Sequence, residues 1–90
     1  MSEKRTFLIE FEDLGPSTIS YKLGDPPLEK ITTTIEGQLP VIYANKDACR
    51  VLAEIFAKLA MSSYPNGFHI HLHENLDDDQ KEILLVGLWL

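Results

Sequence analysis

The stretch that decides the fold is NKDACRVLAEIFAKLAMS, residues 45–62. It predicts a helix over about 46–62, because its apolar residues recur at three- and four-residue steps, which places them along one side of a helix. Asn45 suits the N-cap, and Asp47 puts a negative charge in the first turn, where the helix dipole favours it. The residues expected to be buried along the helix are Ala48, Leu52, Ile55, Phe56 and Leu59.

Runs of alternating or β-branched residues on both sides of this helix predict strands. They cover residues 6–11, 18–23, 30–35, 39–43, 68–74 and 82–90. The last two should form a hairpin, because the short connection between them contains nothing that could form a crossover helix. The expected fold is α+β: a mostly antiparallel sheet of about five strands, with one long helix packed on one face, in a single domain over residues 1–90.

Charge and length narrow the functional classes. The chain has 90 residues, with 8 Lys and Arg against 14 Asp and Glu, a net charge of −6. Scattered basic residues argue against a nucleic-acid partner, whereas an acidic surface favours a basic partner or aids solubility. The longest nearly uncharged apolar stretch, 83–90, is too short to cross a membrane. With one cysteine and no signal peptide, we expect a cytoplasmic protein without a membrane partner or a cofactor.

The last predicted strand is apolar on both faces. Residues 83–90 contain Ile83, Leu84, Leu85, Val86, Leu88, Trp89 and Leu90. A strand with one face in water should alternate, so this strand either lies in the centre of a sheet or meets a partner with its outer face. That partner could be another protein or a second copy in a homodimer.

Three histidines alternate with apolar residues in the strand over 68–74. Side chains of a strand point to opposite faces with a period of two, so His69, His71 and His73 should share one face. Ile70 and Leu72 should then point to the helix.

This histidine face supports two main hypotheses. Imidazole is a common ligand of transition metals, so His69, His71 or His73 could bind one. His69 and His73 are about 13 Å apart along a strand, so only a neighbouring pair could share one ion. Alternatively, the three histidines and Trp89 contact a protein partner. A pH-sensitive interface is a third hypothesis, because histidine titrates near neutrality.

The other reactive residues have simpler interpretations, and we expect no catalytic residue among them. Cys49 could be a nucleophile, but its place beside the helix stripe favours a small core residue. Asp77–Asp79 lacks the ligand spacing of a calcium loop and is expected to be a solvated turn. Glu10, Glu12 and Asp13 are expected to face solvent at the end of a strand.

Two stretches resemble a known family. ANKDACRVLA (44–53) and GFHIHL (67–72) resemble the bacterial immunity protein family thirty-two, from polymorphic toxin systems. Its members pair an Asn-initiated, Leu-Ala-containing helix with a downstream His-x-His-Leu strand and a last apolar strand. The resemblance covers about the second half of the chain, and His73 lies outside it. The matching positions are Asn45, Leu52, Ala53, Gly67, His69, His71 and Leu72.

The resemblance implies an α+β fold and a non-enzymatic role, namely the binding and neutralisation of a cognate toxin. Negative charge would speed the capture of a basic toxin. We therefore expect a protein-interaction domain. The alternative is a small transition-metal-binding protein that uses His69, His71 and His73.

Overall fold

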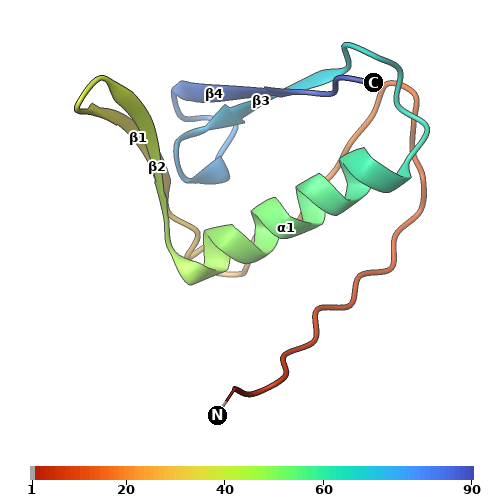
Figure 1. The fold of residues 1–90 in the computed structure, drawn as a ribbon, viewed down its shortest axis with the longest axis horizontal. Coiled ribbons are helices and arrows are strands. Elements are labelled where there is room, and N and C mark those ends of the chain that lie inside the picture. The colour runs from red at the N-terminus through yellow and green to blue at the C-terminus, as the bar shows by residue number, and fades with distance from the viewer. Residues whose placement is uncertain (1) are drawn as a thin grey trace.

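The computed structural model describes residues 2–90 and has an α+β architecture. One helix runs beneath one antiparallel hairpin, while a second hairpin projects from the N-terminal end of the helix (Figure 1). The α+β class is confirmed, but the single five-stranded sheet is wrong, because the four strands form two separate pairs. The elements are β1 (Ile31–Glu36), β2 (Leu39–Ala44), α1 (Lys46–Met61), β3 (His69–His73), η1 (Glu74–Leu76) and β4 (Glu82–Gly87).

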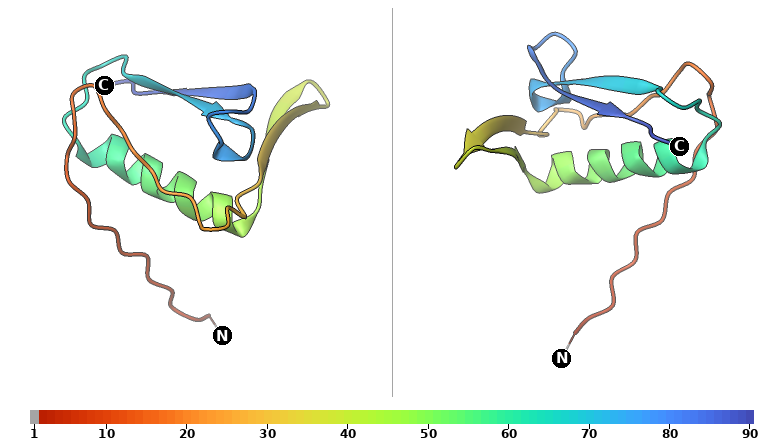
Figure 2. Two further views of the ribbon diagram at one scale, coloured as in Figure 1. Left: turned by 180° about the vertical axis from the view of Figure 1, so that it is seen from behind. Right: turned by 45° about the horizontal axis from the view of Figure 1, so that its top comes forward.

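The two strands predicted nearest the N-terminus are wrong, since residues 6–11 and 18–23 form no strand. The alternation in 18–23 nevertheless reports a real face. Ile19, Tyr21 and Leu23 are half-buried against the core, and the residues between them are exposed. Figure 2 shows this stretch running back along α1 from its C-terminal towards its N-terminal end.

Side chains, rather than a neighbouring strand, hold the extended stretch in place. The Tyr64 hydroxyl donates to the Thr18 carbonyl, and Lys58 Nζ donates to the Ser20 carbonyl at 2.6 Å. The Tyr21 hydroxyl donates to the Leu76 carbonyl at 3.2 Å. A carbonyl that accepts from a side chain has less need of a ladder partner, so the segment is anchored without joining a sheet.

The β1–β2 hairpin closes through a two-residue turn. Gly37 and Gln38 both have positive φ, at 54° and 70°. This is the backbone handedness that matches the twist of two antiparallel strands. Ile31 pairs with Ala44 at the base and Glu36 with Leu39 at the tip, so the hairpin is a regular arm of six residue pairs.

The helix begins and ends as predicted, to within one residue at its C-terminus. Asn45 is the N-cap, with its side chain accepting from the Ala48 amide at 2.9 Å. The predicted burial of Phe56 is wrong, because that side chain is 53% exposed, and the predicted core position of Cys49 is also wrong, because Cys49 is exposed. The two-stranded β3–β4 hairpin covers only a narrow strip along the helix. Successive helix residues are rotated by about 100°, so Phe56 points away from the strip on which its neighbour Ile55 lies. The residues buried along α1 are Ala48, Val51, Ile55 and Leu59.

One small core joins these elements. Ile55 from α1 and Leu72 from β3 are fully buried in the same cluster as Ile31 at the start of β1. Tyr64 and Phe68 stack their rings at 4.2 Å at the far end of the helix. Among residues 2–90, no helix has both the length and the apolar character needed to cross a membrane.

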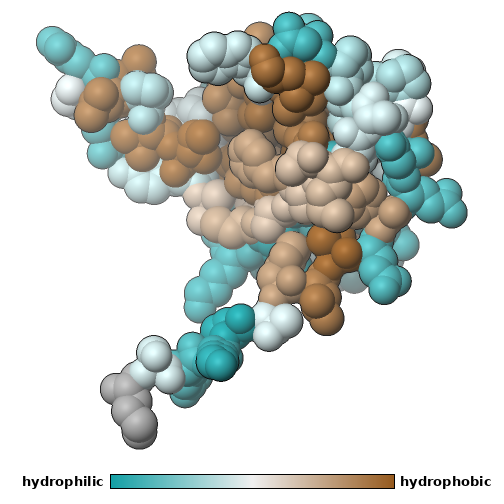
Figure 3. Space-filling view, turned by 45° about the vertical axis from the view of Figure 1, so that its right-hand side comes forward, coloured by the Kyte–Doolittle hydropathy of each residue, from teal (hydrophilic) through white to brown (hydrophobic). Residues whose placement is uncertain are grey.

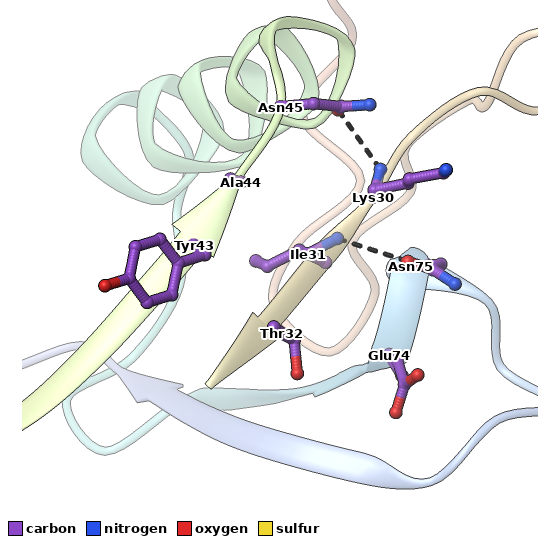
Figure 4. A pocket seen from close by; sticks show the side chains of 8 residues that line it. All are labelled: Lys30, Ile31, Thr32, Tyr43, Ala44, Asn45, Glu74 and Asn75. Carbon is purple, nitrogen blue, oxygen red and sulfur yellow. Dashed lines mark hydrogen bonds between the residues drawn. The ribbon is translucent and has the colours of Figure 1, made fainter. Parts of the chain in front are cut away.

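Two asparagines fix the base of the arm (Figure 4). The Asn45 side-chain oxygen accepts from the Lys30 amide at 3.1 Å as well as from Ala48, and its Nδ2 donates to the Leu28 carbonyl at 2.8 Å. The Asn75 side chain accepts from the Ile31 amide at 3.3 Å. Asn75 itself has φ 58°, a left-handed conformation that asparagine tolerates better than most residues. The start of β1 is therefore held from both sides.

Replacement of Asn45 by alanine tests this arrangement. Asn45→Ala removes the cap and both bonds to residues 28–30, so we expect it to lower the free energy of unfolding by about 1–2 kcal/mol, measured by urea denaturation. Asn45→Asp retains the accepting oxygens and loses only the donor to Leu28, so its effect should be smaller. An unchanged midpoint for Asn45→Ala would contradict the assigned role.

Glu29 is a buried carboxylate whose stabilising effect should depend on pH. Backbone hydrogen bonds lower the pKa of Glu29 below its ordinary value of 4.5: the bond from the Gly24 amide has the largest effect, followed by those from the backbone of Glu29 itself and of Leu28. The positive charge of Arg50 lowers this pKa further. A lowered folded-state pKa stabilises the fold at pH values above the unfolded-state pKa, and this stabilisation is lost as the pH falls through the folded-state value. Glu29→Gln should therefore lower the urea midpoint at neutral pH, and its difference from the native protein should shrink below about pH 4.5. A difference that stays constant with pH would show that the charge is not responsible.

Candidate functional site

The β3–β4 hairpin has one face on the helix and one face open. Ile70 and Leu72 point inward and are buried, whereas His69 and His71 are exposed on the opposite side. The alternation predicted for these four residues is thus observed. In Figure 1, α1 lies on only one side of the hairpin, so the histidine side has no element packed over it in the described part of the chain.

His73 does not continue the exposed row. The β3–β4 register shifts between Leu72 and His73, since Leu72 pairs with Leu84 but His73 pairs with Glu82. The His73 side chain is mostly covered, and its Nδ1 is buried with no hydrogen-bond partner among residues 2–90. Asp78 Oδ1 is the nearby carboxylate, at 3.9 Å from this nitrogen. The expected row of three histidines is therefore a pair plus one separate residue.

The exposed pair is oriented through one nitrogen of each ring. His71 Nδ1 lies 2.8 Å from Glu82 Oε1, and His69 Nδ1 lies 3.2 Å from the Gly67 carbonyl, contacts in which the Nδ1–H tautomer donates. The two ring centroids are 5.2 Å apart. Nε2 is thus the nitrogen that each ring can offer to an outside partner.

Apolar side chains from β4 complete this surface. Leu85 pairs directly with His71 across the hairpin and is 54% exposed, while Gly87 opposite His69 adds no side chain. Backbone pairing continues past β4, where the Leu88 amide donates to the Phe68 carbonyl at 2.8 Å. Trp89 follows at the next position and is 93% exposed. Continued alternation from Leu85 and Gly87 assigns Trp89 to the same side. We call the surface made by His69, His71, Glu82, Leu85 and Trp89 the outer face.

The outer face has two metal-type ligands but not a complete set. Within residues 2–90, no three His, Cys, Asp or Glu side chains gather closely enough to hold an ion. Glu82 contacts the Nδ1 of His71, the position from which a carboxylate orients a metal-binding imidazole rather than binding the metal itself. A metal here would need ligands from water or from a partner.

The remaining candidates from the sequence lie elsewhere. Asp78 and Asp79 are exposed in the turn before β4, where the Asp79 amide donates to the Asp77 side chain at 3.0 Å, and Glu10 and Glu12 are exposed. Asp13 has a structural contact that the sequence did not indicate. Its carboxylate accepts from the Gly15 and Ser63 amides at 2.8 and 2.9 Å, which lowers its pKa and ties the N-terminal segment to the end of α1.

A cleft of about 430 Å³ lies at the base of the arm (Figure 4). Its polar groups already have partners within the fold. The side chains of Asn45 and Asn75 form hydrogen bonds to the backbone of residues 28–31, and Glu74 Oε2 lies 3.7 Å from Lys81 Nζ. These contacts indicate that the polar groups of the cleft stabilise the fold rather than take part in binding or catalysis. Its lining residues are Lys30, Ile31, Thr32, Tyr43, Ala44, Asn45, Glu74 and Asn75.

An apolar groove that the sequence patterns did not predict lies between the arm and the start of β4. Figure 3 shows hydrophobic side chains gathered on the projecting arm, and the groove beside it has a volume of about 420 Å³. The signal for it was present in the run LPVI at 39–42, where a short exposed hairpin carries more apolar side chains than it can bury. The groove is lined by Thr33, Thr34, Ile35, Pro40, Val41, Ile42, Ile83 and Leu84.

No protein-family model, curated protein or solved structure matches the chain.

Proposed function

We propose that this protein is a non-enzymatic interaction domain that binds and neutralises a cognate toxin, as an immunity protein does. The observation that carries the proposal is the outer face. It presents an exposed Leu85 opposite the imidazole of His71, and an almost fully exposed Trp89 just past the end of β4, on a hairpin side that α1 leaves open. Aromatic side chains are enriched at protein interfaces and dominate their binding energy.

The charge of the chain supports a basic partner. The net charge is −6, and the outer face itself contains a carboxylate, Glu82, next to His71. Complementary charge speeds association and suppresses wrong partners more than it adds affinity. A basic toxin would be captured quickly by such a surface.

The resemblance to immunity protein family thirty-two adds a second line of support. Two of its motif positions have structural roles: Asn45 is the N-cap of α1, and Leu72 is buried in the core. Two others, His69 and His71, lie on the outer face. The motif thus combines residues that stabilise the fold with residues that a partner could contact.

Co-expression with the product of an adjacent toxin gene tests the proposal. We expect the native protein to protect the host and to co-purify with the toxin. Trp89→Ala should weaken the complex by about 30-fold, the usual effect of losing a central aromatic anchor, measured by calorimetry. Phe56→Ala is the matched control, because Phe56 is a large exposed side chain on the helix, and it should change affinity less than twofold. Absence of both complex and protection would refute the function.

A second candidate function is transition-metal binding, favoured by the spacing of the exposed pair. The His69 and His71 rings lie 5.2 Å apart, and Glu82 contacts the Nδ1 of His71 as the carboxylate partner of a metal-binding histidine would. His73 would take no part, because the register shift separates it from the pair.

Metal analysis of protein purified without a histidine tag distinguishes the two functions. If the pair binds metal, Zn²⁺ or Ni²⁺ should raise the melting temperature, and His71→Ala should abolish the shift. His73→Ala should leave the shift intact. Less than about a tenth of an equivalent of metal, together with no thermal shift, would exclude this candidate.

A further inference from the structure

The chain exposes more surface than a compact protein of its mass. Its accessible area is 7085 Å², whereas a folded monomer of 10.2 kDa exposes about 5,300 Å². Its radius of gyration is 14.3 Å, against about 12 Å for a compact chain of this length. The excess of about 1,800 Å² is the area that each copy buries in a substantial homodimer interface.

Two projecting parts account for the extended shape, and they join the body at opposite ends of α1. Residues 2–12 leave the body near the C-terminal end of the helix, and the β1–β2 arm projects from its N-terminal end (Figures 1 and 2). Both carry exposed apolar side chains. Leu8 is 87% exposed in the first part and Ile35 is 71% exposed in the second.

The groove beside the arm is open along two strands. Thr33 Oγ1 donates to the Ile83 carbonyl at 3.4 Å, which bridges β1 and β4, but no ladder joins these strands. Ile35 and Ile42 from the arm and Leu84 from β4 contribute apolar walls. An apolar groove next to strand edges suits an extended segment with apolar side chains.

The segment Thr6–Phe11 has that chemistry. Phe7, Ile9 and Phe11 alternate with other residues as in a strand, yet the segment pairs with no strand of its own chain within the described residues. The segment and the groove are therefore complementary in hydrophobicity.

We propose that two copies form a homodimer in which Thr6–Phe11 of each copy lies in the groove of the other. Because the segment and the arm join the body at opposite ends of α1, a two-fold arrangement with antiparallel helices can place each segment beside its partner's groove. The proposed contacts use neither Trp89 nor the histidine pair of the outer face. It is independent of the toxin-binding proposal.

Light scattering during size-exclusion chromatography tests the dimer. The native protein should have twice the mass of 10.2 kDa and dissociate on dilution. A segment variant, Phe7→Asp with Leu8→Asp, and a groove variant, Ile35→Asp with Ile42→Asp, should each weaken the dimer at least about tenfold. All four side chains are exposed, so both variants should keep the native helix content by circular dichroism. Leu90→Asp, at an exposed leucine that belongs to neither the segment nor the groove lining, is the control and should remain dimeric.

Mixing the two variants separates segment exchange from other dimers. Each mixed pair retains one intact segment facing one intact groove. The heterodimer should therefore have a lower dissociation constant than the homodimer of either variant. If the two arms instead packed against each other, mixing would rescue nothing. A monomeric native protein, a segment variant that dimerises normally, or a mixture without heterodimer would each overturn the proposal.

Discussion

The side chain of Asn45 is the contact on which the arrangement of the two halves depends. One oxygen caps α1 at Ala48 and also accepts from the Lys30 amide, while the amide group donates to the Leu28 carbonyl. The helix therefore begins where the chain enters β1, and the arm must leave from this end. A side chain that satisfies three backbone groups at once leaves the arm little freedom to pivot about its base.

The position of the arm explains why so much apolar surface remains exposed. The β3–β4 hairpin covers one narrow line of α1, and the arm projects instead of widening this cover. Side chains such as Phe56 and Ile35 consequently stay in water. A chain of 90 residues can bury only part of its apolar surface, and what it leaves exposed is available for partners.

The outer face and the groove serve different kinds of contact. The outer face combines Trp89 and Leu85 with imidazoles whose orientation is fixed by Glu82 and the Gly67 carbonyl, a mixture suited to specific recognition. The groove is mostly apolar and lies between two strands that no ladder joins. Its chemistry suits an extended segment, and residues 2–12 join the body at the opposite end of α1 from the arm, which suits reciprocal exchange.

The sequence by itself determined the features that depend on a few neighbouring residues. The Asn45 cap, the extent of α1 and the inward Ile70 and Leu72 opposite outward His69 and His71 follow from local hydrogen bonding and periodicity. Tertiary structure decided what depends on distant partners. Residues 18–23 remain outside a sheet, and the side chains of Tyr64 and Lys58 bond to two carbonyl groups of this stretch. The position of His73 depends on a register shift between β3 and β4. Alternation reports a buried face, but a ladder also requires a second strand with free backbone groups, and no local pattern specifies that partner.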